Sequence, residues 1–409
     1  MPGPGTIRLA GAVAVALLAA GLGCREDIVA PGSCPELCPS AGVRVADTTL
    51  TGIVVQDSTY RGYVGAGEMD FLALSNRDSL RSIGLVRLSA RASQWNYGTA
   101  LDDTVSIGSV DSVLLVMNVV QRDTAVHGIR VLFYRLPALF DSTMSFAAAQ
   151  AYLADSLLVD SLMVPDSVAA GTVSKIVPSG TLDRIPDADT GVVALMMVMR
   201  ASGPTTLSVA SSENYSLAGL RAAWYVTGRA PLDTLTHVFT SGASFDSFVR
   251  EREPAMTGAG LAAGGVPAAR SILRLRLDSL ATDSIGVVRA TLVLTPTGPV
   301  GGRPGETFRL SARGVVRDFG AKSMLFPDTS AGGTVSLTAG DSGTIQIDIA
   351  RLLRVWGTSV GDSLPKALML LVEPATTGMG EVSVAGSGAG AAAPRLRLTY
   401  VRPYVFGVP

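Results

Sequence analysis

The sequence predicts an all-β protein built from two tandem jelly-roll or β-sandwich domains, with one short helical insertion in the first domain. The first observation is strict alternation of polar and apolar residues, as in 344–349 and in 395–398. A period of two is typical of a strand with one buried face and one wet face. The second observation is that turn signals separate short strand patterns, which favours a sandwich or a barrel.

A third observation, duplication of sequence blocks, predicts two copies of one domain. Three blocks occur twice in the same order, the last of them discontinuous. They are residues 81–83 with 270–272, 165–174 with 327–336, and 194–226 with 367–401. The offset between the copies changes only from block to block. This indicates matched strands that are joined by loops of different length.

The repeat sets the expected domain boundaries. The third block of the first copy ends at Tyr225-Val226, and a Gly- and Pro-containing stretch follows it. The expected domains are therefore residues 42–228 and 229–409. Each has a length that suits a jelly roll of eight to ten strands.

Helical signals are scarce. Residues 145–158 form the best candidate, with Ser145 as the N-cap and an apolar stripe that includes Phe146 and Leu153. This is the helical insertion of the first copy. Residues 350–356 predict one or two helical turns that pack Leu353 and Trp356 inward.

The N-terminal segment is expected to be a targeting signal. Residues 9–23 are an apolar run of signal-peptide length, and Cys24 follows directly. Residues 1–23 therefore resemble a lipoprotein-type signal peptide with Cys24 as the lipidated residue, and residues 24–41 read as a tether. The alternative is ordinary cleavage near Ala19-Ala20, which leaves Cys24 as a plain thiol.

All three cysteines precede residue 40. If Cys24 carries lipid, Cys34 and Cys38 remain as an even pair, and an oxidising compartment would favour a disulfide between them. The alternative is two free thiols in the tether. No metal site is expected, because no His or further Cys accompanies the pair.

Composition excludes one class of partner. The formal net charge is -1 and no basic patch is present, so nucleic acid binding is not expected. A hydrophobic content of 47% provides material for large cores.

Asp-Ser pairs separate the strand patterns and are interpreted as turns, because such side chains hydrogen-bond their own backbone. These pairs begin at Asp57, Asp78, Asp111, Asp155, Asp160, Asp278, Asp283, Asp341 and Asp362.

No motif identifies an enzyme. Residues 357–361 fit G-x-S-x-G, which would make Ser359 a nucleophile on a strand-to-helix turn. In that fold the catalytic His follows the Ser, whereas His127 and His237 both precede it. No cofactor is expected. The carboxylate-rich stretches 101–103 and 187–189 could bind calcium or simply be solvated turns.

Aromatic side chains beside amides are typical of sugar sites, and Trp95 and Tyr97 in Gln94-Trp95-Asn96-Tyr97 form the best candidate glycan contact. The alternative for Trp95 is a ring that folds back over the edge of the sandwich. Trp224 and Trp356 are expected in the cores.

Three further features resemble the DNRLRE-type domain, which is related to carbohydrate-binding module family 96. They are an Asp-containing opening strand at 46–48, an Arg-Ser-x-Leu-Arg strand at 270–278, and closing strands at 367–371 and 393–400. The resemblance implies a jelly roll of secreted bacterial surface proteins, some of which bind polysaccharide. The first copy departs from the pattern at 84–89, and no ligand residue carries over.

These expectations combine into a non-catalytic lipoprotein that is exported to the outer membrane or cell surface and held there by its lipid anchor. It would act as a binding or structural module of the cell envelope, with polysaccharide or another envelope protein as partner. One alternative is a dedicated polysaccharide-binding surface protein. A second alternative is an extracellular hydrolase.

Overall fold

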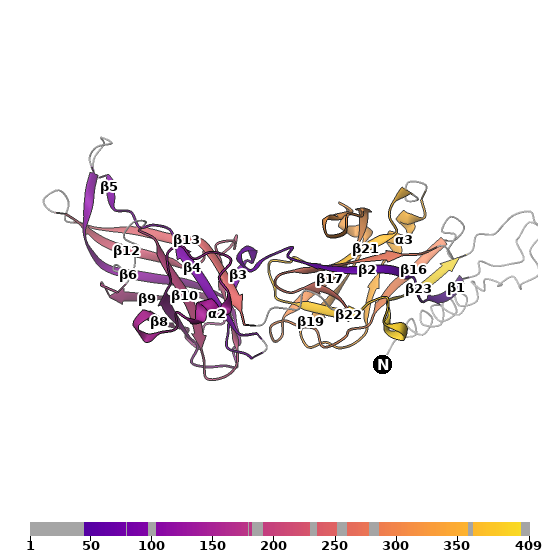
Figure 1. Cartoon of the computed structure of the whole chain (residues 1–409), viewed down its shortest axis with the longest axis horizontal. Helices are drawn as coiled ribbons and strands as arrows, with labels where there is room; N and C mark the ends of the chain where they lie inside the picture. Colours follow the sequence, from indigo (N-terminus) through magenta and orange to yellow (C-terminus); the bar gives the residue numbers. More distant parts are fainter. Residues whose placement is uncertain are drawn as a thin grey trace, which may run out of the picture.

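The computed structural model describes residues 45–78, 80–96, 104–178, 180–181, 191–229, 235–251, 260–277, 286–358 and 363–401. Within these ranges the fold is all-β and antiparallel, with two short α-helices and a few single 3-10 turns (Figure 1). No helix in these ranges is long and apolar enough to span a membrane.

One contiguous segment, residues 62–251, forms what we call the first half. Its elements are β3 (Phe71–Ser75), β4 (Ser82–Leu88), β5 (Gln94–Asn96), β6 (Thr104–Arg122), β7 (Arg130–Arg135), α2 (Phe146–Gln150), β8 (Leu158–Met163), β9 (Gly171–Pro178), β10 (Val193–Arg200), β11 (Thr206–Ala210), β12 (Arg221–Gly228) and β13 (Thr236–Arg250). The path β13-β12-β6-β11-β3-β4 returns to β13, so the sheet closes like a barrel.

The second half combines residues 45–61 with residues 260–401. Its elements are β1 (Val45–Leu50), β2 (Val54–Arg61), β14 (Gly260–Gly264), β15 (Ala269–Leu275), β16 (Gly286–Leu294), β17 (Thr307–Arg317), β18 (Met324–Leu325), β19 (Gly333–Thr338), β20 (Ile345–Asp348), α3 (Ala350–Trp356), β21 (Ala367–Glu373), β22 (Glu381–Ala385) and β23 (Arg395–Val401). One sheet has the order β1-β23-β16-β20. The other runs β18-β17-β21-β15-β14-β22, with β2 paired to β15 and β19 to β17.

The expected division into 42–228 and 229–409 does not follow this strand pairing. β1 pairs with β23 and β2 pairs with β15, so the opening strands of the first copy complete the second half (Figure 1). Conversely, β13 falls within the expected second domain but lies between β12 and β4 of the first half. The first half is thus inserted between β2 and β14 of the second. The order of the repeated blocks predicted the duplication. It did not predict with which copy the opening strands pair.

Two of the sequence blocks are structurally matched and one is not. The strands that contain residues 81–83 and 270–272, β4 and β15, have equivalent neighbours, β10 and β21. Residues 165–174 lead into β9, which pairs with β6, whereas residues 327–336 lead into β19, which pairs with β17. The second block is therefore a coincidence of turn and strand composition.

Each half has its own apolar core. Trp224 is fully buried in the first core and Trp356 in the second, as predicted. The α3 helix also matches its predicted range and buries Leu353 with Trp356. A smaller cluster, which includes Phe140 and Phe146, lies outside the first sheet under the α2 insertion.

The insertion helix is shorter than predicted. Ser145 does cap it, accepting a hydrogen bond from the Ala148 amide at 3.1 Å, but the α-helix ends at Gln150. Leu153 is exposed, and Leu158 already begins β8, which pairs with β7. Strand pairing therefore overrides local helical periodicity after the first turns.

The two halves are locked together by a buried arginine. Arg303 of the second half is 7% exposed, and its guanidinium lies 4.7 Å from the ring centre of Phe71 in the first half. It donates hydrogen bonds to Ser208 and, at 3.2 Å, to the Glu306 carboxylate. That carboxylate also accepts the Met379 amide at 2.6 Å. The cation and its counter-charge are thus buried at the junction of the halves.

Candidate functional site

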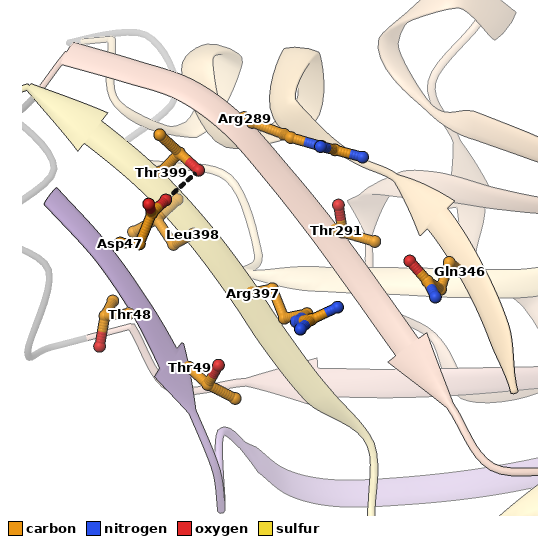
Figure 2. Close-up of a pocket in the computed structure, with 9 residues that line it drawn as sticks. All are labelled: Asp47, Thr48, Thr49, Arg289, Thr291, Gln346, Arg397, Leu398 and Thr399. Carbon is orange, nitrogen blue, oxygen red and sulfur yellow. Dashed lines mark hydrogen bonds between the residues drawn. The ribbon is translucent and has the colours of Figure 1, made fainter. Parts of the chain in front are cut away.

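The outer surface of the sheet β1-β23-β16-β20, which we call the polar face, is the strongest candidate site. Alternation directs apolar residues such as Leu292, Leu396 and Leu398 into the core. The intervening residues point outward and form the open face drawn in Figure 2. Its outward side chains are those of Asp47, Thr49, Arg289, Thr291, Gln346, Arg397 and Thr399. They surround a depression of about 480 Å³, which Thr48 and Leu398 also border.

Strand register arranges these side chains in rows across the sheet. Asp47, Thr399 and Arg289 share one row, because residue 399 pairs with both of the others. Within it the Thr399 hydroxyl donates a 2.5 Å hydrogen bond to the Asp47 carboxylate (Figure 2). The next row contains Thr49, Arg397 and Thr291, again in register. The site is therefore assembled from strands at both ends of the chain.

The charged groups of the polar face that lack partners within the described part of the chain are its arginines. Arg289 and Arg397 are exposed diagonal neighbours on adjacent strands, a relationship that spaces residues about 7–8 Å apart. In the described ranges neither guanidinium has an ion-pair partner. Nearby carboxylates are engaged, since Asp47 accepts from Thr399 and Asp348 accepts from the Ala350 amide at 2.9 Å. The face therefore offers free, forked hydrogen-bond donors.

The equivalent face of the first half differs in chemistry. There β13, β12, β6 and β9 lie side by side, as β1, β23, β16 and β20 do in the second half. Its outward residues include exposed apolar side chains, Val238 at 53% and Ile176 at 64% exposed, beside hydroxyl residues such as Thr240. Arg221, the first residue of β12, is an arginine at an outward position of this face. The duplicated scaffold thus carries two different surfaces.

The predicted glycan contact has a different environment from the polar face. Trp95 lies on β5 at the far end of the first half, half-buried, with ring centres 4.5 Å from His237 and 5.7 Å from Phe239. The ring packs on its own chain, which corresponds to the alternative of folding back over the sandwich edge. Tyr97 lies outside the described residues, so the glycan contact of the pair stays a prediction.

Several other predicted sites fall outside the described ranges. These are Cys24, Cys34, Cys38, Ser359 and the two carboxylate stretches, 101–103 and 187–189. Of the histidines, His127 is exposed and lies 3.2 Å from the Asp166 carboxylate, whereas His237 packs against Trp95. Within the described ranges no group of three or more His, Cys, Asp or Glu side chains could hold a metal ion.

Sequence reasoning missed the polar face. The alternation of residues 395–398 predicted the strand, but it did not show that β1 and β16 place further polar residues beside Arg397. The available signal was a pair of arginines, Arg395 and Arg397, which stand two residues apart on a predicted strand and therefore share its outward side. That pattern is common on wet strands, so it could not have singled out the site.

Comparison of the chain with models of known protein families gives no match, and comparison with curated proteins gives none either. The resemblance to the DNRLRE-type domain accordingly stays a prediction from the residues.

Proposed function

We propose that the chain is an exported, lipid-anchored, non-catalytic binding module of the cell envelope, and that its polar face binds an anionic polysaccharide. The observation that carries the proposal is the pair Arg289 and Arg397, whose guanidiniums lack ion-pair partners in the described ranges and stand among hydroxyl and amide groups on an exposed sheet.

The chemistry of the face favours an acidic polymer over a neutral one. A planar guanidinium binds a carboxylate or sulfate through two parallel hydrogen bonds. Side chains such as Thr49 and Gln346 can bind sugar hydroxyls beside it. Stacking of neutral sugars would need aromatic rings, and none lines the polar face.

The carboxylates of the polar face favour a binding role over glycoside hydrolysis, because both already accept hydrogen bonds within the protein. Hydrolysis of a glycosidic bond ordinarily uses two carboxyl groups on opposite sides of the bond, one of them free to donate a proton. On the polar face Asp47 accepts a hydrogen bond from Thr399, and Asp348 accepts one from the Ala350 amide. A dedicated hydrolase site is therefore not the best account of these residues.

The proposed anchor has a direct test. Lipid on Cys24 would hold the chain by a tether that leads into β1 at Val45. The Cys24→Ala variant is expected to leave the membrane fraction and appear as soluble protein, as followed by fractionation and immunoblotting. A variant that stays in the membrane fraction contradicts the anchor.

The binding proposal is tested by charge removal on both partners. We expect polygalacturonate to bind the full chain and its fully methyl-esterified form to bind much more weakly, in calorimetric titrations at low salt. Arg289→Ala and Arg397→Ala should each raise the Kd about fivefold, as expected for exposed charge pairs, and added salt should weaken binding further.

Arg221→Ala is the matched control, because Arg221 occupies the corresponding sheet of the first half. It should leave the Kd unchanged. Equal binding of the charged and esterified polymers, or equal loss in all three variants, would contradict the proposed site.

A further inference from the structure

A hydroxyl residue follows aspartate far more often than composition explains. The chain has 25 Asp residues, and Ser or Thr follows 18 of them. Ser and Thr make up 70 of 409 residues, so chance would give about four of the 25. In 14 of the 18 pairs the next residue is Ala, Val, Ile, Leu or Thr. The recurring unit is therefore Asp, a hydroxyl residue, and a mostly apolar third residue.

Turn formation accounts for only some of these units. Asp-Gly is the pair that tight turns favour, yet none of the 25 Asp residues precedes one of the 45 Gly residues. Five pairs also lie inside strands, and for those at Asp57, Asp111 and Asp160 this corrects the interpretation as turns. The pairs inside strands begin at Asp47, Asp57, Asp111, Asp160 and Asp246.

Four of the units display their hydroxyl on exposed turns of the first half. The residues are Thr124, Ser142, Ser156 and Ser167, and in the described ranges none of their hydroxyls has a hydrogen-bond partner.

The backbone around two of them is alike. The Asp123 carboxylate accepts the Ala125 amide at 3.0 Å, and the Asp141 carboxylate accepts the Thr143 amide at 2.8 Å. In both turns the Asp carboxylate fixes the backbone through the hydrogen bond that it accepts from the residue two positions later. The hydroxyl residue between them, Thr124 or Ser142, is exposed on the turn. Such a turn presents an acid and a free hydroxyl together to an approaching enzyme.

We propose that these exposed hydroxyls are acceptor sites for O-linked glycosylation, with the preceding Asp as part of the recognised signal. The hydroxyl oxygen would form a bond to the anomeric carbon of a phosphate-linked sugar donor. The bond from that carbon to the donor's phosphate oxygen breaks, and the phosphate leaves with the electron pair. The hydroxyl proton passes to a base of the transferase.

Electrostatics favours a sugar over a phosphate at these positions. A phosphate would place nearly two negative charges beside the Asp carboxylate, where like charges repel. A neutral sugar carries no such cost and hydrates the surface. The chain has only 16% charged residues and a mean hydropathy of +0.37, so surface sugars would offset a weakly charged exterior.

Mass spectrometry of the full chain purified from the cells that encode it tests the proposal. Peptides that contain Thr124, Ser142, Ser156 or Ser167 should carry sugar mass increments. The peptide that contains Ser216, which is exposed but follows Tyr215, should carry none. In the Asp141→Ala variant the increment on Ser142 should disappear while the increments on the other sites remain.

Unmodified peptides at all four positions, phosphate increments in place of sugars, or an undiminished sugar on Ser142 in Asp141→Ala would each overturn the proposal. This readout does not depend on ligand binding at the polar face, so the two proposals fail separately.

Discussion

Residues 229–409, produced as a separate fragment, are expected to stay unfolded, whereas residues 62–251 are expected to fold cooperatively. The first fragment lacks β1 and β2, which leaves β23 and β15 without a neighbour on one edge. It also carries β13, whose partners β12 and β4 are missing from it. The second fragment contains every strand of the closed sheet. Circular dichroism with urea titration distinguishes the two outcomes.

A matched control restores the missing strands. Residues 260–401 joined behind residues 45–61 by a flexible linker should regain β-type dichroism and a cooperative transition, because each strand of the second half then has its neighbours. The fragment 62–251 should melt below the full chain, since Val266, Ala268 and Met379 of the second half help to bury its core. A cooperative 229–409 fragment would contradict the insertion.

Arg303→Ala is expected to be among the most destabilising single changes, lowering the free energy of unfolding by about 3–5 kcal/mol. The change leaves the buried Glu306 carboxylate without its cation and removes the contact with Phe71. Backbone amides still stabilise the carboxylate, which favours the lower end of that range. Urea unfolding of the full chain measures the effect.

Arg351→Ala is the control for this prediction. Arg351 pairs with Asp328 at 3.0 Å, but both side chains are more than half exposed, so solvent screens their attraction. Its unfolding midpoint should match that of the wild type. If Arg303→Ala also unfolds like the wild type, the junction between the halves is not held by the buried arginine.

Local sequence predicted strands well, because a strand's burial pattern is written in its own residues. Residues 344–349 alternate in sequence, and β20 buries Ile345 and Ile347 while Gln346 is exposed. Local sequence did not predict which strands pair with each other, because paired strands can lie far apart in the chain. Asp47 and Thr399 are hydrogen-bonded across a separation of 352 residues, and no pattern within either strand specifies the other.

The alignment of the two copies is also wrong by one residue at the closing strands. The blocks align Tyr225 with Tyr400, yet Tyr225 points outward between buried Trp224 and Val226, whereas Tyr400 packs against the second core. A shift of one position exchanges the faces of a strand. Sequence reasoning therefore selected a tryptophan that packs on its own chain. It passed over Arg289 and Arg397, which become neighbours only once β16 and β23 are in register.

Hydrogen exchange during titration with polygalacturonate tests the central claim most directly, because it locates the ligand on the intact chain. We expect amide protection to rise together in β1 and β23, which come from opposite ends of the sequence and form adjacent strands of the polar face. The first half, including β5 with Trp95, should be unchanged. Protection confined to the first half, or no change at saturating polymer, would contradict the account.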